Sequence, residues 1–264
     1  TWLRSDFTSP IAGVGASYAF KLYGGTVTVL GGTFGGSGSS AFVMGTSEQA
    51  EAYIYGGTFA VTGQAGFSVF QNVSITFEEN GSYEERTGSS ISVSAFAAAI
   101  AIENTTDRNT NVTIHGGTYT GTGTDGEGRD GIWYSNPNAK LTISGGTFTG
   151  NSRSGLFIVH DPGTNIQISG GTFVGADPVK IESEWSGIRM DDYWSNGAIS
   201  TTGGFRGSVW SYYYDGVEIN YDDIIDGKTV YYGGNIEEAQ SRVQSFSSGT
   251  VHDYFAQRKV IYIA

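Results

Sequence analysis

Three short segments of the chain carry side chains that could bind a sugar ring. The segments are GIWYS (Gly131–Ser135), GLFIV (Gly155–Val159) and GIRMD (Gly187–Asp191). Alternation along a strand predicts that Trp133, Phe157 and Arg189 point to the same outward side, which Asp191 shares. Aromatic rings stack on the apolar faces of sugars, and arginine or aspartate pairs with hydroxyl groups. These four are the candidate ligand-binding residues, with the alternative that the long turn over residues 121–130 covers the aromatic rings.

Four acidic residues are the candidate catalytic groups. Glu182 and Glu184 in KIESEW lie two positions apart and share one strand face, whereas Asp191 and Asp192 are adjacent and point to opposite faces. Hydrolysis of a glycosidic bond uses two carboxyl groups about 5–9 Å apart. Glu182 and Glu184 could form an acidic cleft with Asp191, and the alternative is a solvated loop.

The segment DGEGRD offers a candidate calcium site at Asp125, Glu127 and Asp130. Its alternating acids resemble a calcium loop only loosely, because the twelve-residue EF-hand pattern is missing. Calcium is therefore the one candidate ion, and no other cofactor is expected. The histidines at positions 115, 160 and 252 show no metal-binding spacing and are interpreted as structural.

Composition excludes several classes of protein. The chain has 264 residues, 41 of them glycine, no cysteine and a net charge of −12. Nucleic-acid binding needs a basic face, which this charge does not favour. The longest apolar stretch, AFAAAIAI (Ala95–Ile102), is too short to span a membrane. The first residue is Thr1, so we expect either a processed chain or an excised piece of a larger protein.

A repeat organises most of the chain and must position these residues. Glycine pairs begin at positions 24, 31, 56, 116, 145, 170, 203 and 233. A short alternating strand precedes most pairs, and a threonine and an aromatic residue follow five of them, those at 31, 56, 116, 145 and 170. Units of about 25–30 residues built only from strands cannot bury a face alone, so they must stack. The sequence predicts an all-β fold: a single-stranded right-handed parallel β-helix, or β-solenoid, of about eight or nine coils.

Alternation assigns the two sides of the strand before each glycine pair. The interior is predicted to hold apolar pairs, and the intervening residues should face out. The aromatic residue after each glycine pair should stack inside, and the pair itself should turn the corner, where positive φ favours glycine. The predicted interior pairs are Val27/Val29, Ala52/Ile54, Val112/Ile114, Leu141/Ile143 and Ile166/Ile168, and the predicted interior aromatics are Phe34, Phe59, Tyr119, Phe148 and Phe173.

The repeat weakens after about residue 204. We expect the β-helix to occupy residues 1–216 and a C-terminal capping segment to occupy 217–264, with a helix-like patch at Asn235–Gln244. A solenoid needs its last coil covered, because an open edge pairs with other chains. A docking or oligomerisation segment is the alternative for this tail.

The phrase ISGGTF, at Ile143–Phe148 and Ile168–Phe173, resembles a known family of repeat proteins. The chain is similar to right-handed parallel β-helix proteins, especially the GGTF-rich, adhesin-like surface proteins of Gram-positive gut bacteria. The segment GGFRGSVWSYYYDG (Gly203–Gly216) is similar to their terminal element. The resemblance implies an extracellular, cell-surface protein that binds glycans, and its motifs are specific for architecture rather than for activity.

The same architecture is found in pectate lyases, polygalacturonases and phage tailspike depolymerases. Here ENTTD (Glu103–Asp107) and MDD (Met190–Asp192) match the polygalacturonase motifs only loosely, and Gly-His-Gly and Arg-Ile-Lys are absent. Fold alone does not transfer function. We therefore expect a non-catalytic adhesin or glycan-binding module, with a polysaccharide lyase or glycoside hydrolase as the alternative and a spacer stalk as a third reading. The expected partner is a polysaccharide or host-cell glycan, the expected state a monomer rather than a trimer, and no membrane insertion is expected in this segment.

Overall fold

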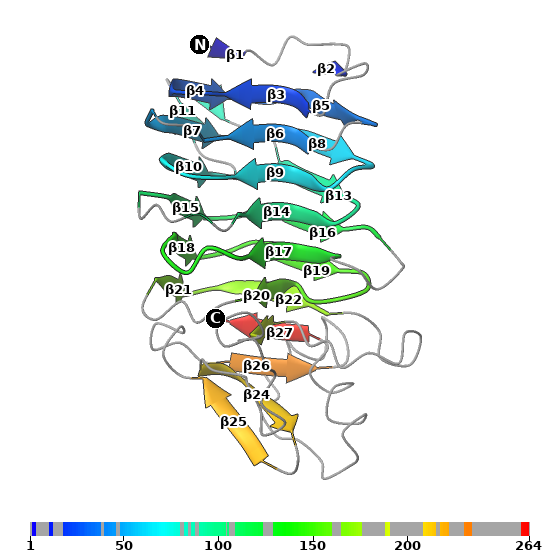
Figure 1. Cartoon of the computed structure of the whole chain (residues 1–264). Helices are drawn as coiled ribbons and strands as arrows, with labels where there is room; N and C mark the ends of the chain where they lie inside the picture. Colours follow the sequence, from blue (N-terminus) through cyan, green and yellow to red (C-terminus); the bar gives the residue numbers. More distant parts are fainter. Residues whose placement is uncertain are drawn as a thin grey trace.

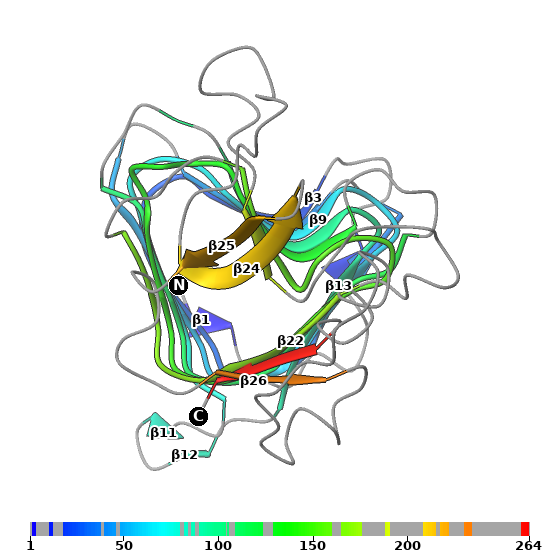
Figure 2. The same cartoon turned by 90° about the horizontal axis from the view of Figure 1, so that it is seen from below.

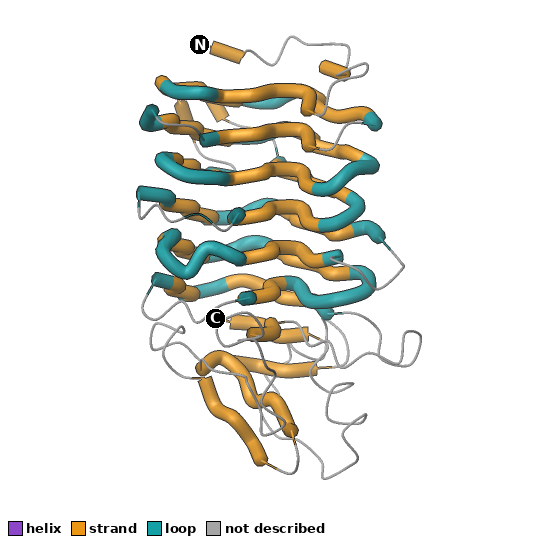
Figure 3. The backbone as a smooth tube through the Cα atoms, in the orientation of Figure 1, coloured by secondary structure: helices purple, strands orange, loops and turns teal. Residues whose placement is uncertain are grey.

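A computed structural model of the chain shows a stack of strands (Figure 1). It describes in full residues 20–37, 40–45, 48–79, 90–103, 105, 109–123, 129–159 and 165–175. It also describes the backbone of strands at 2–3, 11–12, 18–19, 82–83, 86–87, 188–190, 208–214, 217–221, 230–233 and 260–263. In this part of the chain every regular element is a strand (Figure 3). The all-β prediction is confirmed.

Three parallel sheets form the walls of the solenoid (Figure 2). The first sheet contains β1 (Trp2–Leu3), β4 (Gly25–Val29), β7 (Ala50–Ile54), β10 (Val73–Phe77), β15 (Asn111–Ile114), β18 (Lys140–Ile143) and β21 (Ile166–Ile168). The parallel part of the second contains β2 (Ile11–Ala12), β5 (Thr33–Gly36), β8 (Gly57–Val61), β13 (Ile91–Ala95), β16 (Thr118–Gly121), β19 (Thr147–Gly150) and β22 (Gly171–Val174). The third contains β3 (Tyr18–Leu22), β6 (Ser40–Met44), β9 (Ala65–Val69), β14 (Ala98–Ile102), β17 (Asp130–Tyr134), β20 (Leu156–Ile158) and β23 (Ile188–Met190).

Each coil takes one strand from each sheet in turn. Among the described strands, five complete coils run from β4–β5–β6 to β18–β19–β20, and the strand sets β1–β2–β3 and β21–β22–β23 form a further turn at each end. In Figure 1 the third sheet runs leftward in front and the other strands run rightward behind as the chain descends, which is a right-handed coil. The β-solenoid is confirmed, whereas a total of eight or nine coils is not. We number the five complete coils one to five from the N-terminal side.

The predicted interior of the first sheet is confirmed. Strand pairing places Val29, Ile54, Phe77, Ile114, Ile143 and Ile168 in one column, and each is completely buried. Residues between them face outward, and Tyr53 is 38% exposed. Coils of nearly equal length stack with equivalent positions in register. Side chains alternate between inward and outward along one strand, so the same positions point inward in every strand of the sheet.

The aromatic residues after the glycine pairs stack inside, as predicted. Phe34 lies on Phe59 with ring centroids 4.8 Å apart, and Phe148 lies between Tyr119 at 5.0 Å and Phe173 at 4.9 Å. The third coil has no glycine pair, and Val93 occupies the ladder position between Phe59 and Tyr119. This coil is the degenerate unit that the 60-residue spacing from Gly56 to Gly116 indicates.

The glycine pairs turn the corner between the first and second sheets. In all five described pairs that precede an aromatic residue, the second glycine has φ between +105° and +126°. A Cβ on Gly146 would also lie 3.1 Å from the Phe148 ring and 3.2 Å from the Gly117 carbonyl oxygen. Both the backbone conformation and the close stacking of coils therefore require glycine at this position.

The C-terminal end of the second sheet changes direction. β27 (Val260–Ile263) pairs with β22 antiparallel, and β26 (Val230–Gly233) pairs with β27 antiparallel. β24 (Ser208–Tyr214) and β25 (Val217–Tyr221) form a separate antiparallel hairpin. The domain limits 1–216 and 217–264 and the capping role stay predictions, and the helix-like patch at 235–244 lies outside the described residues.

Candidate functional site

The third sheet contains three of the four predicted ligand-binding residues, Trp133, Phe157 and Arg189. Strand pairing aligns Trp133 with Phe157, and Phe157 with Arg189, on three successive coils. Phe157, however, is only 6% exposed, because the Arg153 guanidinium lies 4.2 Å from the centre of its ring. Trp133 is half-buried and keeps an accessible surface. Of the two rings, Trp133 is therefore the accessible one, and the binding role of these residues stays a prediction. Asp191 lies outside the described residues.

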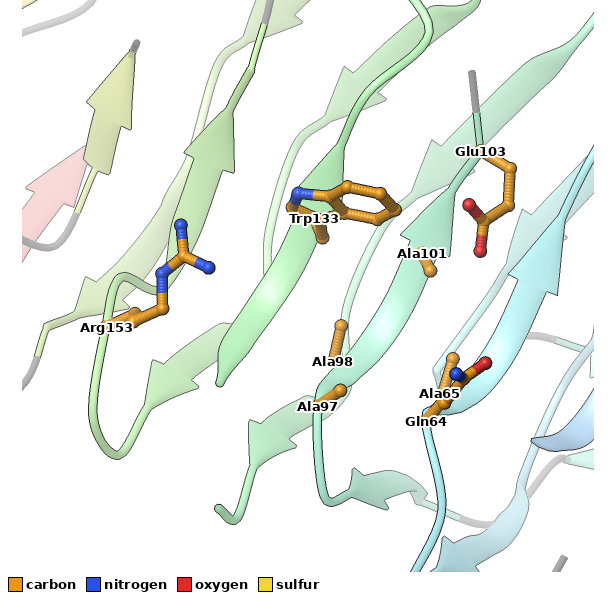
Figure 4. Close-up of a pocket in the computed structure, with 8 residues that line it drawn as sticks. All are labelled: Gln64, Ala65, Ala97, Ala98, Ala101, Glu103, Trp133 and Arg153. Carbon is orange, nitrogen blue, oxygen red and sulfur yellow. The ribbon is translucent and has the colours of Figure 1, made fainter. Parts of the chain in front are cut away.

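A pocket of about 360 Å³ lies beside Trp133 (Figure 4). It extends over the second to fifth coils, and its volume is in the range of small-molecule sites. Figure 4 shows Glu103 and Arg153 on opposite sides of the Trp133 indole. The lining residues are Gln64, Ala65, Ala97, Ala98, Ala101, Glu103, Trp133 and Arg153.

A bend in the third sheet creates the concave surface. Ala98 and Ala101 lie three residues apart, so on a regular strand they would face opposite sides, yet both line the pocket. The bend occurs at small residues that point inward: a Cβ on Gly66 would lie 2.3 Å from the Val93 side chain. The Ser40 and Ser68 hydroxyls meet across the same bend at 2.8 Å. Figure 2 shows the third sheet folding toward the interior.

The pocket opens where the second and third coils carry alanine and the fourth coil carries larger residues. Ala98 pairs with Ala65 on one side and Asp130 on the other, and Ala101 pairs with Trp133. Ala65, Ala98 and Ala101 form an apolar floor, only 1–4% exposed, against which Trp133 packs. The larger side chains of the fourth and fifth coils therefore close one end of the pocket.

Opposite charges mark the two ends of the pocket. The Arg153 Nε atom lies 3.8 Å from Asp130 Oδ2, and the buried Asp130 also accepts a hydrogen bond from the Ser154 N–H at 3.0 Å. At the other end, burial raises the pKa of the Glu103 carboxyl above its ordinary value. The lining thus offers hydrogen-bond donors at Arg153, an acceptor at Glu103, and an apolar surface between them.

The remaining candidate residues are placed as follows. Among the described residues, no group of three histidine or acidic side chains could hold a metal ion. Asp130 is engaged with Ser154 and Arg153, and Asp125 and Glu127 lie outside the described residues, so the calcium site stays a prediction. The catalytic candidates Glu182, Glu184, Asp191 and Asp192 also lie outside them.

His115 contacts side chains of the coils on either side of it. Its Nδ1 lies 2.7 Å from the Ser144 hydroxyl, and its Nε2 lies 3.4 Å from Glu78 Oε1. The three residues come from successive coils on the outer face. Exposed pairs of this kind contribute little to stability.

Sequence reasoning missed most of the pocket lining. Arg153 lies in a turn, where alternation makes no prediction, and ENTTD, which begins with Glu103, indicates only a loose match to a polygalacturonase motif. A signal was nevertheless present in AFAAAIAI, where alanine stands at the positions that hold Asp130 and Trp133 one coil later. Where one repeat carries much smaller side chains than the aligned positions of the next repeat, a hollow in the surface is predicted.

Comparison of the chain with protein-family models, with curated proteins and with solved structures finds no match. The described part of the chain also contains no helix that is long and apolar enough to cross a membrane. The architecture predicted from the GGTF resemblance is confirmed by the fold, and the family itself has no support from these comparisons.

Proposed function

We propose that the chain is a non-catalytic glycan-binding β-solenoid of an extracellular, cell-surface protein. A β-helix is compatible with surface adhesion and with binding or degrading polysaccharides, so the fold leaves these functions open. The pocket beside Trp133 carries the proposal. It combines an accessible indole with an alanine floor and with donors and acceptors at opposite ends, the features that bind a ring with one apolar face and hydroxyls at its rim.

The proposal predicts that Trp133→Ala weakens glycan binding about tenfold or more. Loss of the indole removes the stacking surface, and about 1.4 kcal/mol corresponds to tenfold in affinity. A glycan array followed by calorimetric titration of the best ligand measures the effect. Tyr53→Ala, an exposed aromatic on the first sheet, is the matched control and should retain affinity.

Equal affinity in the Trp133 variant and the wild type would contradict this site. Absence of binding to every glycan would favour a spacer stalk. Light scattering should give a monomer, and a trimer would instead favour a tailspike-like assembly. The net charge of −12 supports a partner other than nucleic acid.

A polysaccharide-degrading activity is the second candidate, and the position of Glu103 favours it. A carboxyl with a raised pKa beside an aromatic ring is suited to general-acid catalysis. A second carboxyl would have to come from the candidates Glu182, Glu184, Asp191 and Asp192. Release of reducing ends by the wild type and its loss in Glu103→Gln would establish this activity, whereas binding without product supports the non-catalytic proposal.

A further inference from the structure

The charges around the pocket decide between acidic and neutral sugars. The Arg153 guanidinium already lies against the Phe157 ring and near the Asp130 carboxylate. Asp130 is completely buried behind the lining, Glu103 is the acidic side chain of the lining itself, and the whole chain carries a net charge of −12. A carboxylated or sulfated sugar would therefore meet an arginine whose charge Asp130 already offsets. The electrostatics therefore favour a neutral ligand.

The floor of the pocket adds a second requirement. Ala65, Ala98 and Ala101 present only methyl groups there, and Trp133 packs against them. A sugar hydroxyl directed at this floor would lose its hydrogen bonds to water without gaining a partner, which costs about 1–3 kcal/mol. A methyl group in the same place would gain from burial, at about 0.8 kcal/mol per carbon. The floor therefore selects a neutral sugar that carries a methyl group.

The pocket rim offers partners for an amide next to such a methyl group. The side chain of Gln64 lines the pocket, and its backbone carbonyl accepts hydrogen bonds from Ala97 N–H at 3.1 Å and Ala98 N–H at 2.9 Å. These bonds fix the Gln64 backbone beside the floor. A side-chain amide both donates and accepts, as an acetamido group does.

We propose that the pocket binds an N-acetylhexosamine, with its acetamido methyl on the Ala65–Ala98–Ala101 floor and its ring against Trp133. The inference rests on the proposed glycan-binding function and names the sugar class for that site. Gln64 pairs with the acetamido group, Glu103 accepts from a ring hydroxyl, and Arg153 donates at the opposite end.

Ligand-observed NMR tests the proposal with five monosaccharides: N-acetylglucosamine, N-acetylgalactosamine, glucose, galactose and glucuronate. Saturation transfer should be strongest at the acetamido methyl protons, and the two N-acetylated sugars should bind at least tenfold more tightly than the other three. Ala98→Val fills the floor and should remove this preference. Ala60→Val, an exposed alanine on the second sheet, is the matched control and should keep it.

The outcomes separate this inference from the proposed function. Equal binding of glucose and N-acetylglucosamine, with both lost in Trp133→Ala, would overturn the acetamido assignment and leave glycan binding intact. Tighter binding of glucuronate would overturn the assignment to a neutral sugar. Absence of binding to all sugars would overturn both. The comparison of sugars on the wild-type protein stands even if Ala98→Val does not fold.

Discussion

Glu103 shows how one residue of a repeat gains a property that its equivalents lack. Strand register places it after Ile102, where Phe70 follows Val69 in the previous coil and Ser135 follows Tyr134 in the next. Its carboxyl is half-buried at the edge of the pocket, and desolvation raises its pKa above the ordinary value of 4.5. Removal of water penalises the charged form, so folding favours the protonated carboxyl.

This shift predicts a pH dependence of stability. The contribution of Glu103 to the free energy of unfolding is complete below pH 4.5, the ordinary pKa of the carboxyl. It is lost as pH rises through the raised pKa, because the carboxyl then becomes charged in the folded chain, where burial disfavours the charge. Glu103→Gln has no charge to desolvate. Its free energy of unfolding, from urea denaturation at constant ionic strength, should therefore rise relative to the wild type from about pH 4 to pH 7. Parallel curves for the two proteins would contradict the effect of burial.

At the scale of one element, the third coil turns its corner without a glycine pair. The chain leaves the first sheet after β10 and enters the second at β13, and the Glu79 carboxylate lies beside this corner. It accepts hydrogen bonds from Ile91 N–H at 3.2 Å and Gly117 N–H at 3.0 Å. Between the fourth and fifth coils, the Thr147 N–H donates to the Gly117 carbonyl at 2.8 Å. The Glu79 carboxylate thus joins backbone N–H groups of the third and fourth coils at this corner.

Glu79→Ala should lower the free energy of unfolding by about 2–3 kcal/mol, because two backbone N–H groups lose a charged acceptor. Glu79→Gln keeps one acceptor oxygen and should lose less. Glu78→Ala is the matched control, since its side chain is 37% exposed and forms an exposed ion pair with His115, so a change within about 0.5 kcal/mol is expected. Denaturant unfolding followed by tryptophan fluorescence measures all three. Equal losses at positions 78 and 79 would show that the carboxylate does not hold the corner.

Elements also show what the sequence could predict and what it could not. The first-sheet strands alternate regularly, so Val112 and Ile114 could be assigned to the interior from the sequence alone. The third-sheet strands bend at small residues such as Gly66, and a bend places residues three apart on one face. Period-2 alternation does not predict two residues three apart on the same face. The outward direction of Trp133 was therefore predictable from the sequence, and the pocket beside it was not. Arg153 reaches Phe157 from a turn, where no periodic rule applies.

For the whole molecule, the interior aromatic ladder divides into two parts. Phe34 and Phe59 stack on the N-terminal side, and Tyr119, Phe148 and Phe173 stack on the C-terminal side. Val93 interrupts the ladder, and edge-to-face contacts of Phe77 with Phe67 at 5.0 Å and with Tyr119 at 5.5 Å connect the two parts. Coils of a solenoid contact only their neighbours, so stability is close to a sum of local terms. The third coil is therefore the expected boundary between two units of local unfolding.

Phe148→Ala should test this boundary. Removing a fully buried ring costs about 3–5 kcal/mol, and the loss should fall on the coils that the ring joins. Amide hydrogen exchange should show reduced protection in β15–β22 and nearly unchanged protection in β4–β9. Phe59→Ala is the matched control with the reverse pattern, because its ring stacks on Phe34 in the N-terminal part. Equal loss of protection in both parts for either variant would mean that the solenoid unfolds as one cooperative unit. The edge-to-face contacts of Phe77 would then be strong enough to couple the two aromatic stacks across Val93.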